Sequence, residues 1–143
     1  MTPSDKARVL FICIGNSCRS QMAEGFARRY GADVMIAASA GLAPAFMVAQ
    51  DTVRAMDEKN IDIRDQFPKS LKQLGRAQFD LFVNMSGFDL PPEIDTPVRD
   101  WPVPDPVAED YETHCQIRDE IETRVMGLIL ELRRAAEGRW SGR

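Results

Sequence analysis

Hydrophobic and polar positions form blocks along the chain, and each block predicts one secondary-structure element. Residues 9–12 are all apolar and lead into Cys13, which predicts a central parallel strand that is covered on both faces. An amphipathic helix is predicted over residues 19–30, with Gly31 as its stop signal. Its large apolar positions recur every four residues: Met22, Phe26 and Tyr30.

The same reasoning divides the rest of the chain into alternating elements. Further strands are predicted at residues 34–39, 80–85 and 98–101. Helices are predicted at about 48–59, 68–74 and 111–136. The last helix carries an apolar stripe: Ile117, Ile121, Val125, Leu128 and Leu132. Strands that alternate with helices predict an α/β fold with a parallel sheet, and ligands bind such sheets at the carboxyl ends of the strands, where Cys13 stands.

Length and charge favour a single domain over residues 1–143, with residues 1–6 and 138–143 frayed at its ends. The net charge of −4 argues against a nucleic-acid partner, because such partners need a clustered basic face. No apolar run approaches the roughly 18 residues of a membrane span, and the first residues lack the apolar core of a signal peptide. We therefore expect a cytoplasmic protein without a membrane partner.

The cysteine and histidine counts narrow the chemistry further. Three cysteines without an export signal argue against a structural disulfide framework. The single histidine, His114, excludes a metal site built on a histidine pair. No metal or cofactor is therefore expected.

The segment between the first strand and the first helix predicts an oxyanion-binding loop with a thiolate at its floor. Gly15 would let the chain turn sharply, so that the following amides and the positive end of the helix converge on one point. These amides belong to Ile14, Gly15, Asn16, Ser17, Cys18, Arg19 and Ser20. Arg19 adds a planar fork for two oxygens, and Ser20 can donate a hydrogen bond to the sulfur. Cys13 is then a thiolate placed for in-line attack on a tetrahedral oxyanion, whereas the alternative is a cysteine that only fills buried space.

The run from residue 13 to 25 resembles the low-molecular-weight protein tyrosine phosphatase superfamily, which includes arsenate reductases of the same fold. Gln21 stands where the phosphatase branch usually has proline, so this run is closer to the reductase branch. Further matches lie at residues 39–41, 55–63, 80–85 and 105–106. The resemblance implies a three-layer sandwich with a four-stranded parallel sheet flanked by helices on both faces. It also implies Cys13 as nucleophile, Arg19 as oxyanion clamp and Asp105 as general acid.

The resemblance also implies a set of residues that support the loop. Asn16 would hold the loop conformation through its side chain. In reductases with a structural potassium ion, positions that match Asn16, Glu24 and Ser39 line the ion, together with an acidic residue near position 69. This chain has Lys69 there. One hypothesis is that the Lys69 ammonium stands in for the cation; the alternative is a solvated surface lysine.

Two departures from the superfamily pattern bear on the reaction. Thioredoxin-coupled reductases carry two further cysteines after the third strand, but residues 84–92 contain none, so a three-cysteine relay cannot operate. Phosphatases that take phosphotyrosine usually have two aromatic residues after the Asp-Pro pair, where this chain has Val107 and Ala108. Other aromatic side chains could take over that role: Phe46, Phe88 or Tyr111.

Four other residues bear on redox chemistry or packing. Cys18 is a redox candidate, because a reversible disulfide with Cys13 would protect the nucleophile; the alternative is a packed thiol. Cys115, at the edge of the last helix, is assigned a structural role, with a resolving role as the minority alternative. His114 is assigned to packing or capping, and Trp101 to filling the core beside the acid loop.

Three functions follow from these residues. A phosphatase would hydrolyse phosphomonoesters through a phosphocysteine at Cys13, with Asp105 as acid and then base. An arsenate reductase would use the same loop on arsenate and take electrons from a small thiol, a glutaredoxin or thioredoxin, or Cys18. An oxyanion sensor would bind phosphate or arsenate without reaction. The sequence favours the phosphatase, because hydrolysis needs nothing that the chain lacks.

Overall fold

The computed structural model describes residues 6–74 and 78–141. The elements in chain order are β1 (Ala7–Cys13), α1 (Arg19–Tyr30), β2 (Met35–Gly41), α2 (Gln50–Asp57), the 3-10 turn η2 (Lys72–Leu74), β3 (Leu81–Asn84), β4 (Val98–Asp100) and α3 (Tyr111–Ser141). The fraying expected at residues 1–5 and 142–143 lies outside the described residues. At residues 138–141 it is not seen, because α3 continues to Ser141 rather than ending near Ala136.

The four strands form one parallel sheet in the order β2-β1-β3-β4, which confirms the predicted α/β class. β1 lies at the centre, and its residues from Val9 to Cys13 are at most 2% exposed, which explains its unbroken apolar pattern. The chain places β2 on one side of β1 and β3 on the other. The carboxyl end of β1, where Cys13 stands, is therefore a topological switch point of the kind at which ligands bind.

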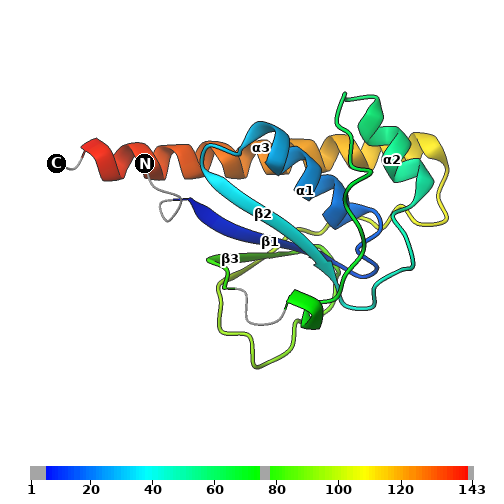
Figure 1. The fold of residues 1–143 in the computed structure, drawn as a ribbon, viewed down its shortest axis with the longest axis horizontal. Coiled ribbons are helices and arrows are strands. Elements are labelled where there is room, and N and C mark those ends of the chain that lie inside the picture. The colour runs from blue at the N-terminus through cyan, green and yellow to red at the C-terminus, as the bar shows by residue number, and fades with distance from the viewer. Residues whose placement is uncertain (1–5, 75–77, 142–143) are drawn as a thin grey trace.

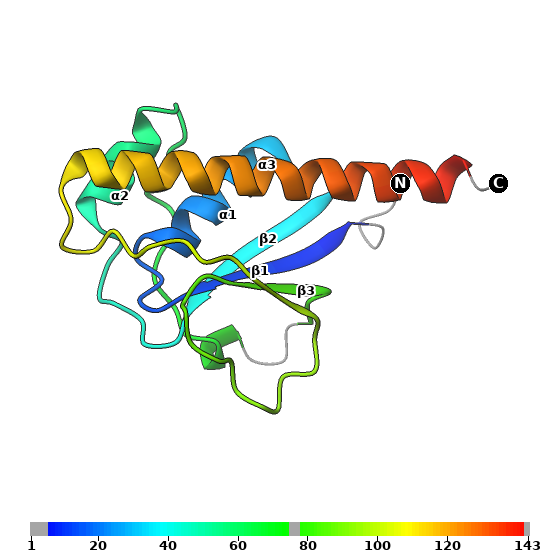
Figure 2. The same ribbon diagram turned by 180° about the vertical axis from the view of Figure 1, so that it is seen from behind.

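All three α-helices cover the same face of the sheet (Figures 1 and 2). The stripe of α3 predicted from the sequence faces this layer, with Ile121 and Val125 fully buried. Gly31 ends α1 as predicted, and the structure adds a reason for glycine there. A Cβ atom on Gly31 would lie 2.7 Å from Cγ1 of Ile129, so only glycine lets the end of α1 approach α3 this closely.

The opposite face of the sheet has a thinner cover. Leu10, Ile12 and Phe82 form its apolar cluster, which η2 and the neighbouring loops cover. The resemblance implied helices on both faces, and in the described part of the chain η2 is the helical element on this one. The helix predicted over residues 68–74 shrinks to η2 because Gly41 donates its N–H to Lys69 O at 2.8 Å, which holds residues 69–70 beside the end of β2.

Candidate active site

The loop between β1 and α1 turns at a different residue from the predicted one. Asn16 is the residue in the left-handed region, with φ of 50°, and Gly15 is not among the residues with positive φ. Asparagine tolerates this region better than other side chains do, so the sequence signal for the turn was Asn16. Gly41 of β2 lies directly behind, where a Cβ atom would come within 2.7 Å of Ile14 O.

The Asn16 side chain connects this turn to the nucleophile. Its Oδ1 accepts the backbone N–H of Lys69 at 2.9 Å, and its Nδ2 donates to Ser20 Oγ at 2.7 Å. Ser20 Oγ lies 2.9 Å from Cys13 Sγ. Because Asn16 already donates to the Ser20 hydroxyl, the hydrogen of that hydroxyl is free to point at the Cys13 sulfur. Asn16, Ser20 and Cys13 therefore lie together as predicted.

Arg19 is 4% exposed and held by loops that follow the neighbouring strands. Its Nη1 donates to Met85 O and, at 3.0 Å, to Val103 O. Its Nη2 lies 3.5 Å from Asp105 Oδ2, and its buried Nε has no hydrogen-bond partner among the described residues. The two carbonyls hold Nη1, and the clamp role predicted for the remaining Nε–Nη2 edge, where Nη2 also faces Asp105, stays a prediction.

Asp105 stands across the site on the loop that precedes α3. Its Oδ1 accepts the Val107 N–H at 3.0 Å, and its side chain is 35% exposed. The carboxyl group is partly open to solvent, beside Arg19 and on the wall of the cavity that holds Cys13. The general-acid role predicted for Asp105 stays a prediction that this position permits.

A cavity of about 200 Å³ opens above the nucleophile. Its lining is Cys13, Ile14, Gly15, Ser17, Cys18, Arg19, Ala45, Asp105 and Val107. Ala45 was missed by sequence reasoning, since no motif marks it; it is placed by its N–H, which donates to Gly15 O at 2.8 Å. None of the described residues that line it is aromatic.

The three aromatic residues considered as substitutes for the missing pair lie elsewhere. Phe46 is fully exposed and Phe88 is 62% exposed. Tyr111 has Arg54 over its ring at 3.8 Å and bonds Glu58 through its hydroxyl. None of them forms a wall of the cavity.

The residues proposed to support the loop also gather behind it. Glu24 is 7% exposed and accepts from Ser39 Oγ at 2.6 Å and from Arg28 Nη1 at 3.3 Å. The Lys69 ammonium donates to Phe67 O at 3.1 Å, and burial lowers the pKa of Lys69, while the charge of Glu24 raises it. The ion pair described for Glu24 in this region is with Arg28, so the cation role of Lys69 stays a prediction.

The three cysteines are free thiols. Cys18 lines the cavity beside Cys13, and burial raises the pKa of the Cys18 thiol. Cys115 is half-buried on α3, with its Sγ 3.5 Å from Glu58 Oε2. The position of the missing relay cysteines is taken by a polar turn, in which Ser86 donates to Asn84 Oδ1.

His114 and Trp101 have the packing roles that the sequence suggested. His114 is 3% exposed at the start of α3, where its backbone N–H donates to Asp110 O at 3.1 Å and its ring Nδ1 lies 3.3 Å from the same oxygen. The Trp101 ring packs 6.0 Å from that of Phe11. Among the described residues, no helix is long and apolar enough to cross a membrane, and no group of three His, Cys, Asp or Glu side chains is placed to hold a metal ion.

Comparisons with known proteins found similar sequences and similar structures. The family model for low molecular weight phosphotyrosine protein phosphatase matches residues 8–90. The glutaredoxin arsenate reductase of Synechocystis sp. is 34% identical over 129 residues, which cover 87% of this chain and 98% of that protein. A solved arsenate reductase in its phosphate-binding state superposes with a TM-score of 0.81 at 34% identity and covers 88% of this chain and 98% of its own.

The YwlE arginine phosphatase from Geobacillus stearothermophilus has a TM-score of 0.79 over 90% of this chain and 94% of its own, and at 23% identity it shows the shared fold alone. The similar proteins are enzymes, and so is this chain. The family match over residues 8–90 and the 34% identity over most of its length mean that the chain belongs to the low molecular weight phosphotyrosine protein phosphatase family.

Proposed function

We propose that the protein reduces arsenate to arsenite, with Cys13 as the nucleophile and an external thiol as the reductant. The observation that carries the proposal is the cavity above Cys13, which has about 200 Å³ and no aromatic wall. Such a cavity suits a free tetrahedral oxyanion better than a phosphorylated aromatic ring. The similarity to proteins named arsenate reductases supports the same conclusion.

The first step forms a bond between sulfur and arsenic. The Cys13 thiolate attacks arsenic, one arsenic–oxygen bond breaks, and Asp105 donates the proton with which that oxygen leaves as water. The Nε–Nη2 edge of Arg19 and the loop amides hold the remaining oxygens. Arsenic is still pentavalent in this adduct.

The next steps transfer the electrons. A thiolate attacks the Cys13 sulfur, a disulfide forms, and the sulfur–arsenic bond breaks with its electron pair left on arsenic, which departs as arsenite. A second thiolate attacks the mixed disulfide and returns Cys13 to a thiolate. One arsenate and two thiols thus give one arsenite, one disulfide and one water.

The chain lacks relay cysteines after β3, and this limits where the thiols can come from. Residues 84–92, at the end of β3 and directly after it, contain no cysteine, so the relay of thioredoxin-coupled reductases has no counterpart there. A small thiol or a glutaredoxin-type or thioredoxin-type partner then reaches Cys13 through the cavity, or Cys18 forms an internal disulfide that the partner reduces. We also propose a cytoplasmic location, where such thiols are kept reduced.

The phosphatase that the sequence favoured is the second candidate. Its supporting observation is the Arg19–Asp105 pair at 3.5 Å. Together with Cys13, this pair provides the residues that phosphoryl transfer and hydrolysis need. The same pair serves arsenate equally well, and the names of the similar proteins support the reductase better. An oxyanion sensor has no observation in its favour.

The test is a parallel assay of one reduced preparation. Arsenate turnover is measured with glutathione and glutaredoxin, with thioredoxin, and with dithiothreitol, and hydrolysis is measured on an aryl phosphate. We expect arsenate reduction with at least one thiol system and only slow hydrolysis, both lost in Cys13→Ser. Efficient hydrolysis without arsenate reduction would establish the phosphatase instead, and phosphate binding with neither activity would indicate the sensor.

A further inference from the structure

Gln66 is a buried polar residue that the sequence did not single out. It lies between α2 and η2 and is 9% exposed. Its amide Nε2 donates to two oxygens of one residue, Gln21 O at 3.0 Å and Gln21 Oε1 at 2.8 Å. Gln66 therefore holds both the main chain and the side chain of Gln21, in the first turn of α1.

Gln21 in turn holds the catalytic loop. It is fully buried, and its Nε2 donates to Asn16 O at 2.9 Å and to Phe67 O at 3.1 Å. These contacts fix the orientation of the Gln21 amide, because a flip would turn Oε1 against two carbonyl oxygens and Nε2 against the Gln66 amide. Gln66 therefore selects the orientation in which Gln21 is a donor to the loop.

The Asn16 carbonyl is the point at which this chain of contacts meets the site. Asn16 is buried at φ of 50°, and its side chain bonds Ser20, which contacts the Cys13 sulfur. The Asn16 carbonyl accepts a hydrogen bond from Gln21 and is therefore held toward Gln21. In this orientation its negative end cannot turn toward a bound oxyanion. If Gln21 lost its fixed orientation, the Asn16 peptide and the Ser20 contact would both be free to shift.

We propose that Gln66 is a positioning residue for the oxyanion loop. It acts through Gln21 and Asn16, and it sets how well the loop amides and Ser20 bind the oxyanion and the thiolate. The proposal rests on the proposed function only in that the loop binds a tetrahedral oxyanion, and it holds whether phosphorus or arsenic reacts. It goes beyond the family pattern, because Gln66 belongs neither to the oxyanion loop, nor to the loop of the general acid, nor to the residues that match the cation site.

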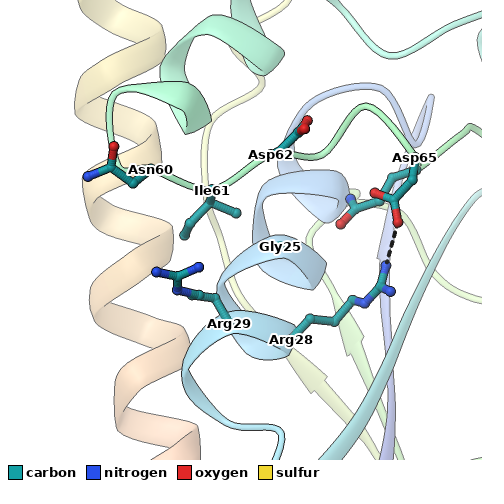
Figure 3. A pocket seen from close by; sticks show the side chains of 8 residues that line it. Gly25, Arg28, Arg29, Asn60, Ile61, Asp62 and Asp65 are labelled. Carbon is teal, nitrogen blue, oxygen red and sulfur yellow. Dashed lines mark ion pairs between the residues drawn. The ribbon is translucent and has the colours of Figure 1, made fainter.

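The surroundings of Gln66 make this testable without loss of the fold. Gln66 lines a second, open cavity of about 390 Å³, between the end of α1 and residues 60–66. Figure 3 shows its floor at Gly25, with Arg28 and Arg29 leaving α1 to opposite sides and Arg28 directed at Asp65. A substituted side chain at position 66 therefore has open space beside it and need not fit into a closed core.

The experiment measures phosphate affinity by calorimetry and the pH dependence of alkylation at Cys13, resolved by peptide mass spectrometry. Gln66→Leu and Gln66→Glu both remove the donor, and each is expected to raise the Kd for phosphate about tenfold, as for a lost buried hydrogen bond. Each should also move the pH midpoint of Cys13 alkylation upward. The control Gln116→Leu, at an exposed position of α3, should leave both quantities unchanged.

A double-mutant cycle with Gln21→Leu identifies the route. If Gln66 acts through Gln21, the double variant binds phosphate about as weakly as Gln21→Leu alone. Additive losses, or wild-type affinity and pH midpoint in folded Gln66→Leu and Gln66→Glu, would overturn the proposal. Failure of the wild-type protein to bind phosphate would instead count against the oxyanion site itself. Thermal unfolding separates loss of fold from loss of positioning, and Gln66→Glu keeps the size of the side chain if Gln66→Leu is unstable.

Discussion

The two sides of the oxyanion loop are built in different ways. On the supporting side, side chains from the loop itself, α1 and β2 are buried and hydrogen-bonded: Asn16, Gln21, Glu24 and Ser39. On the reacting side, the walls come from loops, and Asp105 and Val107 are 35% and 59% exposed. The polar groups of the supporting side are buried with hydrogen-bond partners, whereas the loop residues Asp105 and Val107 of the reacting side are more open to solvent.

This difference separates two parts of the chemistry. The supporting side positions the thiolate and the amides, which any attack on a tetrahedral oxyanion needs. The reacting side determines what else enters, either a leaving group or a thiol, and there the chain departs from its superfamily by lacking relay cysteines and an aromatic pair. Substitutions on the two sides should therefore change different measurements.

The largest effect is expected at the point where the two sides meet. Cys13→Ser should lower turnover by at least about 10³-fold, because the hydroxyl is a far weaker nucleophile at neutral pH. Phosphate should still bind, since the loop amides and Arg19 remain. Steady-state assays and calorimetry on the same sample check both parts. Residual turnover near the wild-type level would exclude Cys13 as the nucleophile.

Arg19→Lys tests the clamp on the reacting side. Lysine keeps the charge but lacks the Nε–Nη2 edge and cannot reproduce the bonds to Met85 O and Val103 O. Turnover should fall about 10²–10³-fold, with a weaker loss of phosphate binding, because the fork is matched to the transition state. Equal losses in turnover and binding would mean that Arg19 only binds the ground state.

Asp105→Asn separates the two candidate functions. Hydrolysis of an aryl phosphate should fall about 10²-fold or more, because the leaving group and then the water both need a proton transfer. Arsenate reduction should fall less at low pH, where the departing oxygen is already protonated by solvent. Rate–pH profiles for both substrates measure this. Identical profiles for wild type and Asp105→Asn would remove Asp105 from either mechanism.

The sequence predicted the regular elements and the supporting side better than the loops. Strand and helix periodicity brought Cys13 and Ser20 to the same end of the sheet, because periodicity fixes which residues share an edge or a face. Glu24 was indicated by the family resemblance alone. The turn was assigned to Gly15 although Asn16 makes it, since both residues tolerate bent backbone. Gln66 gave no sequence signal, because its partner lies 45 residues earlier in the chain and only the packing of residues 66–67 against α1 brings them together.

A smaller effect, on stability, is expected from the ion pair that Arg28 forms with Glu24 on the supporting side. Arg28→Ala should lower the unfolding free energy by about 1 kcal/mol, since its ion pair at 3.3 Å is half exposed. If Lys69 stands in for a cation, Lys69→Ala should also lose stability, and potassium should restore it in that variant but not in the wild type. Thermal unfolding in potassium and in choline chloride checks this. No loss in Lys69→Ala would make Lys69 a surface residue.

The smallest effect concerns Cys18, which lies on the boundary between the two sides. Burial raises the pKa of its thiol, so the folded protein holds this proton at a pH where the unfolded chain, with an ordinary value of about 8.5, has released it. The stability that this adds is fully present below about pH 8.5 and is lost as the pH rises through the raised pKa. Between pH 8 and 10.5 the unfolding free energy of the wild type should therefore fall more steeply than that of Cys18→Ala, by at most about 1.4 kcal/mol per pH unit.

Cys115→Ala is the matched control for this slope, because Cys115 is half-buried on α3 and away from the cavity. Equal slopes in the wild type and Cys18→Ala would show that the Cys18 thiol is not held in its protonated form by the fold. The direction of this pH dependence also bears on which thiol acts as the reductant. A thiol that the fold keeps protonated at neutral pH attacks the Cys13 sulfur slowly, so a steep slope in the wild type favours an external thiolate, entering from the reacting side, as the group that releases arsenite.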